Sequence, residues 1–211
     1  MNLDFPGVLS DKGGGGRLSE KGCVWGVFWV RVRYTLHMTT IIGVQNEDGC
    51  LLAADSRTTN EIGRPYHHEK VAKITERGKW IIAGAGDPNA CDIVQHLWSA
   101  PKQQGNDDYK YMVTQVALSI RDCLTKNKYE KDKADKEGGF IFLIAYKGII
   151  YEIDDTFTVY MRDDGYYGIG SGARWALGAL QAGADWQKAL EIAEKNDIYT
   201  GRPFTSLSQS T

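Results

Sequence analysis

The sequence predicts an α+β domain in which antiparallel sheets are covered by helices. Three observations support this class. Short runs rich in Ile, Val and Leu come in pairs joined by turn residues, which is typical of β-hairpins. Two such pairs are followed by two helix-like segments. Further strands and two further helices then follow, whereas a parallel βαβ fold would alternate single strands with single helices.

Two hairpins open the domain. Residues 40–45 and 50–54 are rich in Ile, Val and Leu, and the connection between them ends in Gly49, which tolerates positive φ. Residues 70–75 and 80–83 form the second pair, joined by the polar residues 76–79.

Two helices follow the hairpins. Asp87 and Pro88 are an N-cap residue followed by a proline at the first helical position, and the helix they open runs to about residue 98. Residues 109–126 form a longer amphipathic helix. We expect these two helices to form one covering layer.

The second half repeats the order of strands and then helices. Residues 140–146 and 149–153 form a third hairpin around Lys147-Gly148, and a shorter pair spans 158–160 and 167–169. The next elements are a helix at 172–181, a helix at 185–195 capped by Asp185, and a last strand at 204–208.

The composition is that of a globular chain about the size of one domain. Of the 211 residues, 42% are hydrophobic and 25% are charged, which argues against disordered and collagen-like classes. The net charge of -2 argues against a nucleic-acid partner, because phosphate binding needs a surplus of Lys and Arg. The longest apolar run, residues 23–30, is too short to cross a bilayer, so no membrane partner is expected.

The cysteines favour a reducing compartment. The chain has four, Cys23, Cys50, Cys91 and Cys123, with no C-x-x-C spacing. Neither a zinc site nor a disulfide framework is therefore predicted. We expect a cytoplasmic protein with no metal and no cofactor.

Composition changes near residue 38, which divides the chain into residues 1–38 and a domain at 39–211. Residues 1–38 contain a four-glycine run and carry five Lys or Arg against three Asp or Glu. Three interpretations compete: a removable pro-segment, a regulatory tail, or upstream sequence read through from an early assigned start. We favour the last, in which Met38 is the initiator and Thr39 is small enough for a methionine aminopeptidase to expose it.

Three other motifs are best interpreted without a functional role. The run from Gly168 to Ala173 fits a dinucleotide fingerprint, but the acid that should end a second parallel strand about twenty residues on falls in a predicted helix. His67 and His68 are adjacent and have no third ligand at a suitable spacing. Residues 126–137 hold nine charges of both signs and are typical of a solvated segment.

The informative feature is a set of motifs at fixed spacing. Thr39 is followed by Asp55 sixteen residues later and by Lys70 thirty-one residues later, then by the run 83–87 (Ala-Gly-Ala-Gly-Asp) and, far downstream, by 170–172 (Gly-Ser-Gly). This pattern resembles the proteasome β-subunit and its bacterial ring-peptidase relative, members of the N-terminal-nucleophile hydrolase superfamily. The match runs from Thr39 to about Ser208 and implies a four-layer αββα sandwich.

The resemblance also implies the site residues. In that family the mature chain begins at a threonine whose hydroxyl attacks the peptide carbonyl, and Thr39 matches it. Asp55 and Lys70 match the acid and the lysine; Lys70 is preferred for its distance back from Ala83-Gly84, and Lys73 is the alternative. The other matches are the supporting serine and acid Ser171 and Asp197, the hydroxyl residue Thr200, the arginine Arg57, Gly84 as the oxyanion donor, and Ile82 in the pocket for the residue before the scissile bond.

Elementary chemistry supports those roles. A threonine hydroxyl is a weak nucleophile until a base takes its proton, and a terminal amine with a pKa of about 7.7 to 8.0 can do so at neutral pH. A protonated Lys70 beside Asp55 would favour the neutral amine and the developing alkoxide. The alternative is that Asp55, Arg57 and Lys70 form a structural ion network without catalysis.

Departures from the family pattern leave alternatives open. Proteasome pro-segments usually end in glycine before the threonine, whereas Met38 precedes Thr39 here, so enzymatic removal of an initiator methionine fits better than autocleavage. A chain that keeps residues 1–38 has no free amine at Thr39 and should be inactive. The alternatives are a non-catalytic ring subunit of the same fold and a small-amide amidohydrolase of the superfamily.

The resemblance implies partners as well. It predicts polypeptide substrates, identical or homologous ring subunits, and an ATP-dependent unfoldase or cap. The 39–41 opening (Thr-Thr-Ile) and the run 198–200 (Ile-Tyr-Thr) are similar to the bacterial peptidase, whereas 55–57 (Asp-Ser-Arg) is similar to the proteasome proper. The subfamily therefore stays open.

Overall fold

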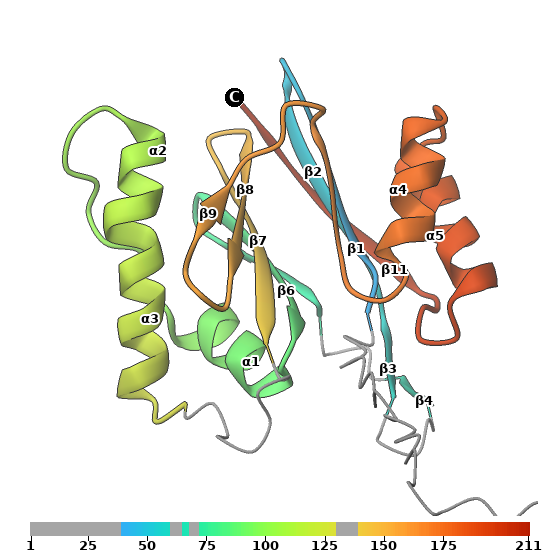
Figure 1. The fold of residues 1–211 in the computed structure, drawn as a ribbon, viewed down its shortest axis with the longest axis horizontal. Coiled ribbons are helices and arrows are strands. Elements are labelled where there is room, and N and C mark those ends of the chain that lie inside the picture. The colour runs from blue at the N-terminus through green and yellow to red at the C-terminus, as the bar shows by residue number, and fades with distance from the viewer. Residues whose placement is uncertain (1–38, 60–64, 68–71, 130–138) are drawn as a thin grey trace, which may run out of the picture. The chain divides into compact units, whose positions relative to one another are not determined.

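Two antiparallel β-sheets pack face to face, and each carries helices on its outer face (Figure 1). The computed structural model describes residues 39–59, 65–67, 72–129 and 139–211. All of these residues belong to one compact unit, Arg33–Thr211. The predicted α+β class and its four-layer αββα arrangement are confirmed.

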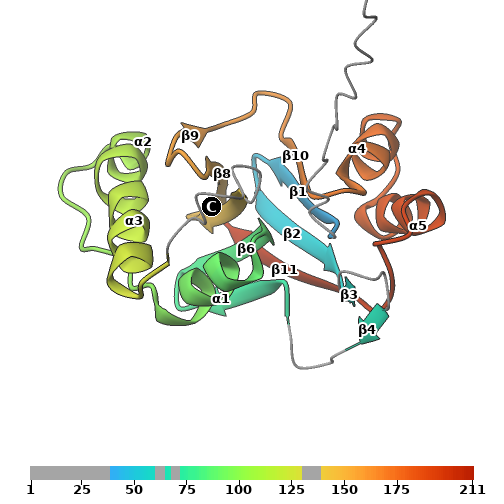
Figure 2. The same ribbon diagram turned by 60° about the horizontal axis from the view of Figure 1, so that its bottom comes forward.

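The first sheet has the strand order β10-β1-β2-β11, and every neighbouring pair is antiparallel. Its strands are β1 (Ile41–Asn46), β2 (Gly49–Asp55), β10 (Tyr166–Ile169) and β11 (Phe204–Ser210). The register sets Ile41 opposite Ala54 and Phe204 opposite Asp55. The starts of β1 and β11 and the end of β2 therefore meet at one end of the sandwich, which Figure 2 turns toward the viewer.

The second sheet has the order β5-β6-β7-β8-β9 and is also antiparallel. Its strands are β5 (Ile74–Arg77), β6 (Trp80–Gly86), β7 (Phe140–Tyr146), β8 (Ile149–Asp154) and β9 (Val159–Tyr160), and a separate ribbon joins β3 (Arg57–Thr59) to β4 (Pro65–His67). The second predicted hairpin is confirmed from Ile74 onward, while residues 70 and 71 lie outside the described residues. His67 lies in β4, and His68 and most of the charged segment 126–137 lie outside the described part.

One predicted strand pair is wrong. Residues 158–160 and 167–169 were expected to pair with each other, but β9 pairs with β8 in the second sheet and β10 pairs with β1 in the first. The short connection 161–165 crosses between the sheets. Two short strands close in sequence carry no signal that distinguishes a hairpin from such a crossing.

The helices follow the prediction closely. On one side lie α1 (Pro88–Leu97) and a continuous run of α2 (Asp108–Tyr111), the π-helical stretch η1 (Met112–Val116) and α3 (Ala117–Lys126); on the other lie α4 (Ala173–Gln181) and α5 (Trp186–Asn196). Asp87 caps α1 by accepting from Asn89 and Ala90 N–H, and Asp185 caps α5. No described helix has the length and apolarity needed to cross a membrane.

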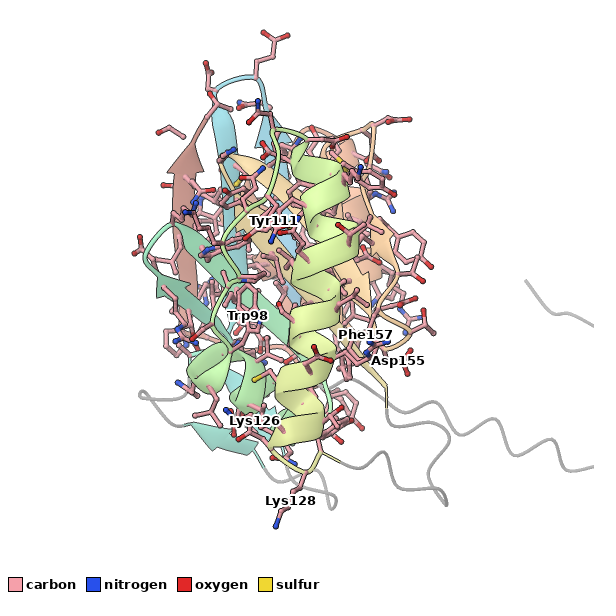
Figure 3. The ribbon with its side chains drawn as sticks, turned by 90° about the vertical axis from the view of Figure 1, so that its left-hand side faces the viewer. Trp98, Tyr111, Lys126, Lys128, Asp155 and Phe157 are labelled. Atoms are coloured by element: carbon pink, nitrogen blue, oxygen red, sulfur yellow. The ribbon has the colours of Figure 1, made fainter. Side chains whose placement is uncertain are left out.

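Three apolar cores hold the layers together. Along β6 the side chains alternate, so Trp80 and Ile82 face the helices while Ile81 and Ala83 face the other sheet. The indole of Trp80 meets Trp98 at the end of α1, with ring centroids 5.4 Å apart. Figure 3 labels Trp98, at the end of α1, and Tyr111, which belongs to the continuous α2–η1–α3 run. A third core packs α4 and α5 on the first sheet.

Two buried thiols make the fold sensitive to alkali. Burial raises the pKa of Cys50 to about 11 and that of Cys91 to about 12, from an ordinary value of 9.0. Between pH 9 and 11 the unfolded chain loses these protons while the folded chain keeps them, so stability falls as pH rises. The slope is at most about 1.4 kcal/mol per pH unit for each thiol.

Urea unfolding between pH 8 and 11 would test this expectation. Between pH 9 and 10, a Cys50→Ala/Cys91→Ala variant should lose most of the alkaline slope, although it starts less stable. Above pH 10 the slope should remain in part, because burial also raises the pKa of Tyr129 and Tyr151 to about 12 from an ordinary value of 10.0. The control Cys123→Ala removes a half-buried thiol and should keep most of it. An equally steep slope in the double variant would show that other groups cause the alkaline sensitivity.

Candidate active site

Thr39 lies at the end of the sandwich where β1 begins. It is buried, with 7% of its surface exposed. Its carbonyl oxygen lies 3.5 Å from the Gly172 amide nitrogen and 3.4 Å from the Ser171 hydroxyl. Gly170 has a φ of +93°, and a Cβ at this position would lie 2.1 Å from the same oxygen. The first residue of the Gly-Ser-Gly run must therefore be glycine, because of its positive φ and because the Thr39 carbonyl lies so close.

Asp55 is held by four hydrogen-bond donors at the end of β2. Its Oδ1 accepts from the Thr40 N–H at 2.8 Å and from Lys73 Nζ at 2.6 Å. Its Oδ2 accepts from the N–H groups of Arg57 at 2.9 Å and Gly201 at 3.0 Å. The side chain has no exposed surface, and both oxygens face donors, so the arrangement suits a carboxylate.

Lys73 is the lysine that contacts Asp55 in the described residues, and Lys70 lies outside them. The Lys73 ammonium also donates to the Arg57 carbonyl at 2.7 Å, and 10% of the side chain is exposed. Burial lowers the Lys73 pKa, while the charges of Asp55 and Asp197 oppose that shift. The Lys73 carbonyl accepts from the buried Gln95 amide of α1, which anchors the residue before β5.

A second polar network joins Ser171, Asp197 and Thr200 to the hydroxyl of Thr40. Asp197 Oδ2 accepts from the hydroxyls of Ser171 at 2.7 Å and Thr200 at 2.6 Å. Thr200 Oγ1 lies 2.5 Å from the hydroxyl of Thr40. Ser171, Asp197 and Thr200, which the sequence predicted as supporting residues, therefore meet in one cluster.

Arg57 ties these two networks together. Its guanidinium donates to the Ile198 carbonyl at 2.8 Å and lies so close to Gly201 that a Cβ there would be 2.4 Å from Nε. Arg57 Nε is buried and finds no hydrogen-bond acceptor among the described residues. Arg57 thus contacts Asp55 and Lys73 through its backbone and the α5–β11 loop through its side chain.

Two glycines of β6, Gly84 and Gly86, lie near this site and differ in their backbone conformation. Gly84 N–H, expected to face the oxyanion, is directed at the Lys73 carbonyl at 3.4 Å. Gly86 lies two residues farther along β6, opposite Phe140 of β7, and β5 begins at Ile74, opposite Ala83. Gly86 has a φ of +110°, which favours glycine.

Ile82 does not fit the role of a pocket residue. Its side chain has no exposed surface and packs in the core between β6 and the helices. The alternation along β6 puts it on the helix face, so substrate could reach it only if the core opened. No described residue takes over this role by a contact in the structure.

Two features of the site were missed. Thr40 and Gly172 take part in the hydroxyl network, and their signals in the sequence were the Thr-Thr pair and the second glycine of the Gly-Ser-Gly run. The dinucleotide interpretation of 168–173 is excluded, because the run joins antiparallel β10 to α4 and the region that should hold the acid is α5. Among the described residues, no cluster of three His, Cys, Asp or Glu side chains could hold a metal ion.

Known proteins with similar sequences and structures share this architecture. The chain is 25% identical over 166 residues to the ATP-dependent protease subunit HslV of Lysinibacillus sphaericus, covering 75% of this chain and 86% of that one. The structure of Thiobacillus denitrificans BPH in complex with epoxomicin matches with a TM-score of 0.66 at 22% identity, covering 82% and 98% of the two chains. HslV from Trypanosoma brucei matches with a TM-score of 0.58 at 18% identity, covering 82% and 100%.

The family model described as "Proteasome subunit" matches residues 36–201. This range includes Thr39, both polar networks and every strand except β11. The predicted family is confirmed, and the chain belongs to the proteasome subunit family.

Proposed function

We propose that the chain is a threonine-type endopeptidase subunit of a self-compartmentalised particle. Its active form begins at Thr39, and domain 39–211 is the catalytic unit. The observation that carries the proposal is the buried Asp55–Lys73 pair, 2.6 Å apart and bonded to the backbone of the residue after Thr39. Membership of the proteasome subunit family and the similarity to protease subunits support it.

Thr39 supplies both the nucleophile and the base. With residues 1–38 removed, its amine takes the proton of its own hydroxyl, and Oγ1 attacks the peptide carbonyl. The proton then passes to the leaving amine, the peptide C–N bond breaks, and an ester to Thr39 remains. A water molecule, deprotonated by the same amine, hydrolyses that ester and restores the hydroxyl.

Lys73 takes the role that the sequence assigned to Lys70. Its ammonium has three N–H groups, of which Asp55 Oδ1 and the Arg57 carbonyl accept two. The third is left for the Thr39 hydroxyl, where a positive charge favours the developing alkoxide. Asp55 stabilises the ammonium against the burial that disfavours it.

The oxyanion donor is Gly86 N–H rather than Gly84 N–H. The Gly84 amide is directed at the Lys73 carbonyl, whereas Gly86 lies two residues farther along β6, past the end of the β5–β6 pairing at Ile74 and Ala83. A fixed backbone N–H stabilises the tetrahedral intermediate, and in a related chemistry the loss of one side-chain donor in that role costs roughly 100- to 1,000-fold in rate.

The partners follow from the same proposal. The chain assembles into rings with copies of itself or homologous subunits, and its substrates are unfolded polypeptides delivered by an ATP-dependent partner, as the name of the L. sphaericus relative suggests. The free thiols of Cys50, Cys91 and Cys123 suit a cytoplasmic site of action.

N-terminal sequencing of the active protein tests the proposal. The fraction that cleaves a fluorogenic peptide should begin at Thr39. Acetylating the terminal amine of that fraction at near-neutral pH should stop turnover, because it removes the base. Intact-mass measurement identifies the outcomes that contradict the proposal. Turnover by protein that retains residues 1–38 would overturn the mechanism. Folded rings that begin at Thr39 but show no turnover would favour a non-catalytic subunit.

A further inference from the structure

Thr40, the residue after Thr39, joins the two polar networks of the site. It has no exposed surface. Its N–H donates to Asp55 Oδ1 at 2.8 Å, and its carbonyl accepts from the Asp55 N–H at 3.0 Å. Its hydroxyl instead contacts Thr200, 160 residues away in the chain, at 2.5 Å. One residue therefore contacts the Asp55–Lys73 pair through its backbone and the Ser171–Asp197–Thr200 cluster through its side chain.

The direction of the hydroxyl contacts follows from proton counting. The Thr200 hydroxyl has one proton and lies 2.6 Å from Asp197 Oδ2, a carboxylate oxygen that can only accept. That proton is therefore used, and in the 2.5 Å contact the Thr40 hydroxyl must be the donor. Thr40 thus begins a one-way chain of hydrogen bonds that runs to Thr200 and ends on Asp197.

Gly172 makes room for this chain. A Cβ at residue 172 would lie 2.0 Å from Thr40 Oγ1, 2.5 Å from Thr200 Oγ1 and 3.0 Å from Asp197 Oδ2. The φ of Gly172 is -84°, which any residue adopts, so backbone conformation does not require glycine here. The space is needed by the three oxygens instead, which makes the hydroxyl chain a built feature of the site.

We infer that Thr40 is a positioning residue of the proposed reaction. Its hydroxyl orients Thr200 toward Asp197, and Asp197 in turn holds the Ser171 hydroxyl that lies 3.4 Å from the Thr39 carbonyl. Without the Thr40 hydroxyl, Thr200 is free to turn away from Asp197, and the carboxylate loses one of its two hydroxyl donors. Thr39 then loses both its alignment and the fixed charge pattern around its amine. The inference rests on the proposed function.

Thr40→Val tests it, because valine keeps the shape and removes the hydroxyl. We expect kcat to fall about 10- to 100-fold, as for a small misplacement of reacting groups. The acid limb of the pH profile of kcat/KM should move to higher pH. With fewer hydrogen bonds, the Asp197 carboxylate stabilises the protonated form of the Thr39 amine more strongly, so the amine becomes a free base only at higher pH. Thr40→Ser should restore both values, and Thr205→Val, on an exposed position of β11, should change neither.

Two further measurements protect the test against misfolding. Gly172→Ala perturbs the same three oxygens from the residue that precedes α4 and should give the same loss and the same shift. In the unaltered protein, the hydroxyl protons of Thr40 and Thr200 should give slowly exchanging NMR signals, because both are buried and bonded. Rapid exchange of both protons, or an unchanged kcat and pH profile in a folded Thr40→Val, would overturn the inference.

The failure of the proposed function gives a different result. If the Thr39→Ala variant cleaves the peptide as fast as the unaltered protein, the peptidase mechanism is wrong, whatever the effect of Thr40→Val. If turnover depends on Thr39 but not on the Thr40 hydroxyl, the mechanism stands and only the positioning role fails.

Discussion

Replacing Thr39 with alanine is expected to abolish peptide hydrolysis, with a loss of about 10⁴-fold or more, because the nucleophilic oxygen is gone. The fold should be unaffected, since the contacts of Thr39 to Ser171 and Gly172 use its backbone carbonyl. Turnover of a fluorogenic peptide by a chain beginning at residue 39 is the measurement. Thr39→Ser keeps the hydroxyl and should retain much of the activity.

Two results would bear against the assignment of Thr39 as the nucleophile or refine it. Unchanged turnover in Thr39→Ala, with mass spectrometry confirming the substitution and the first residue, would assign the hydrolysis to another group or to a contaminant. Equal inactivity of Thr39→Ser and Thr39→Ala would show that the β-methyl group contributes to alignment.

Lys73→Met is expected to reduce turnover about 1,000-fold, because it removes the cation that we propose for stabilising the Thr39 alkoxide. It should also lower the free energy of unfolding by about 3 to 5 kcal/mol, since it leaves the Asp55 carboxylate buried without its partner charge. Turnover and near-UV circular dichroism at a temperature where the variant is folded would separate the two effects.

Two matched lysine variants sharpen that experiment. Lys79→Met changes an exposed lysine in the β5–β6 turn that donates to the Tyr146 hydroxyl, and it should leave turnover unchanged. Lys70→Met tests the lysine that the sequence favoured. If Lys70→Met is inactive and Lys73→Met is active, the assignment of the cation to Lys73 is wrong.

Much of the fold could be predicted because its signals are local. The 46–49 connection with its glycine marks the β1–β2 hairpin, and Asp87-Pro88 marks the start of α1, as the structure confirms. The β9–β10 pair could not be predicted, because the partners of a short strand depend on which sheet has a free edge. That information lies in the packing of the whole domain.

The candidate site was predictable only in part. Asp55, Ser171, Asp197 and Thr200 stand at spacings that the family resemblance makes informative, and the structure brings them together around Thr39. The choice between Lys70 and Lys73 depends on the length of a loop, which a count back from Ala83 does not reveal. The role predicted for Ile82 depends on which face of β6 its side chain occupies. The role predicted for Gly84 depends on whether its N–H is already bonded to the chain that runs beside β6.

The span of the Thr40–Thr200 contact and of the bond from Gly201 N–H to Asp55 has a consequence for how the enzyme is made. Residues up to 201 must leave the ribosome before the last of these partners is available. Under the proposed mechanism, Thr39 therefore stays inactive during synthesis, and peptidase activity begins only when the α5–β11 loop docks onto the first strands.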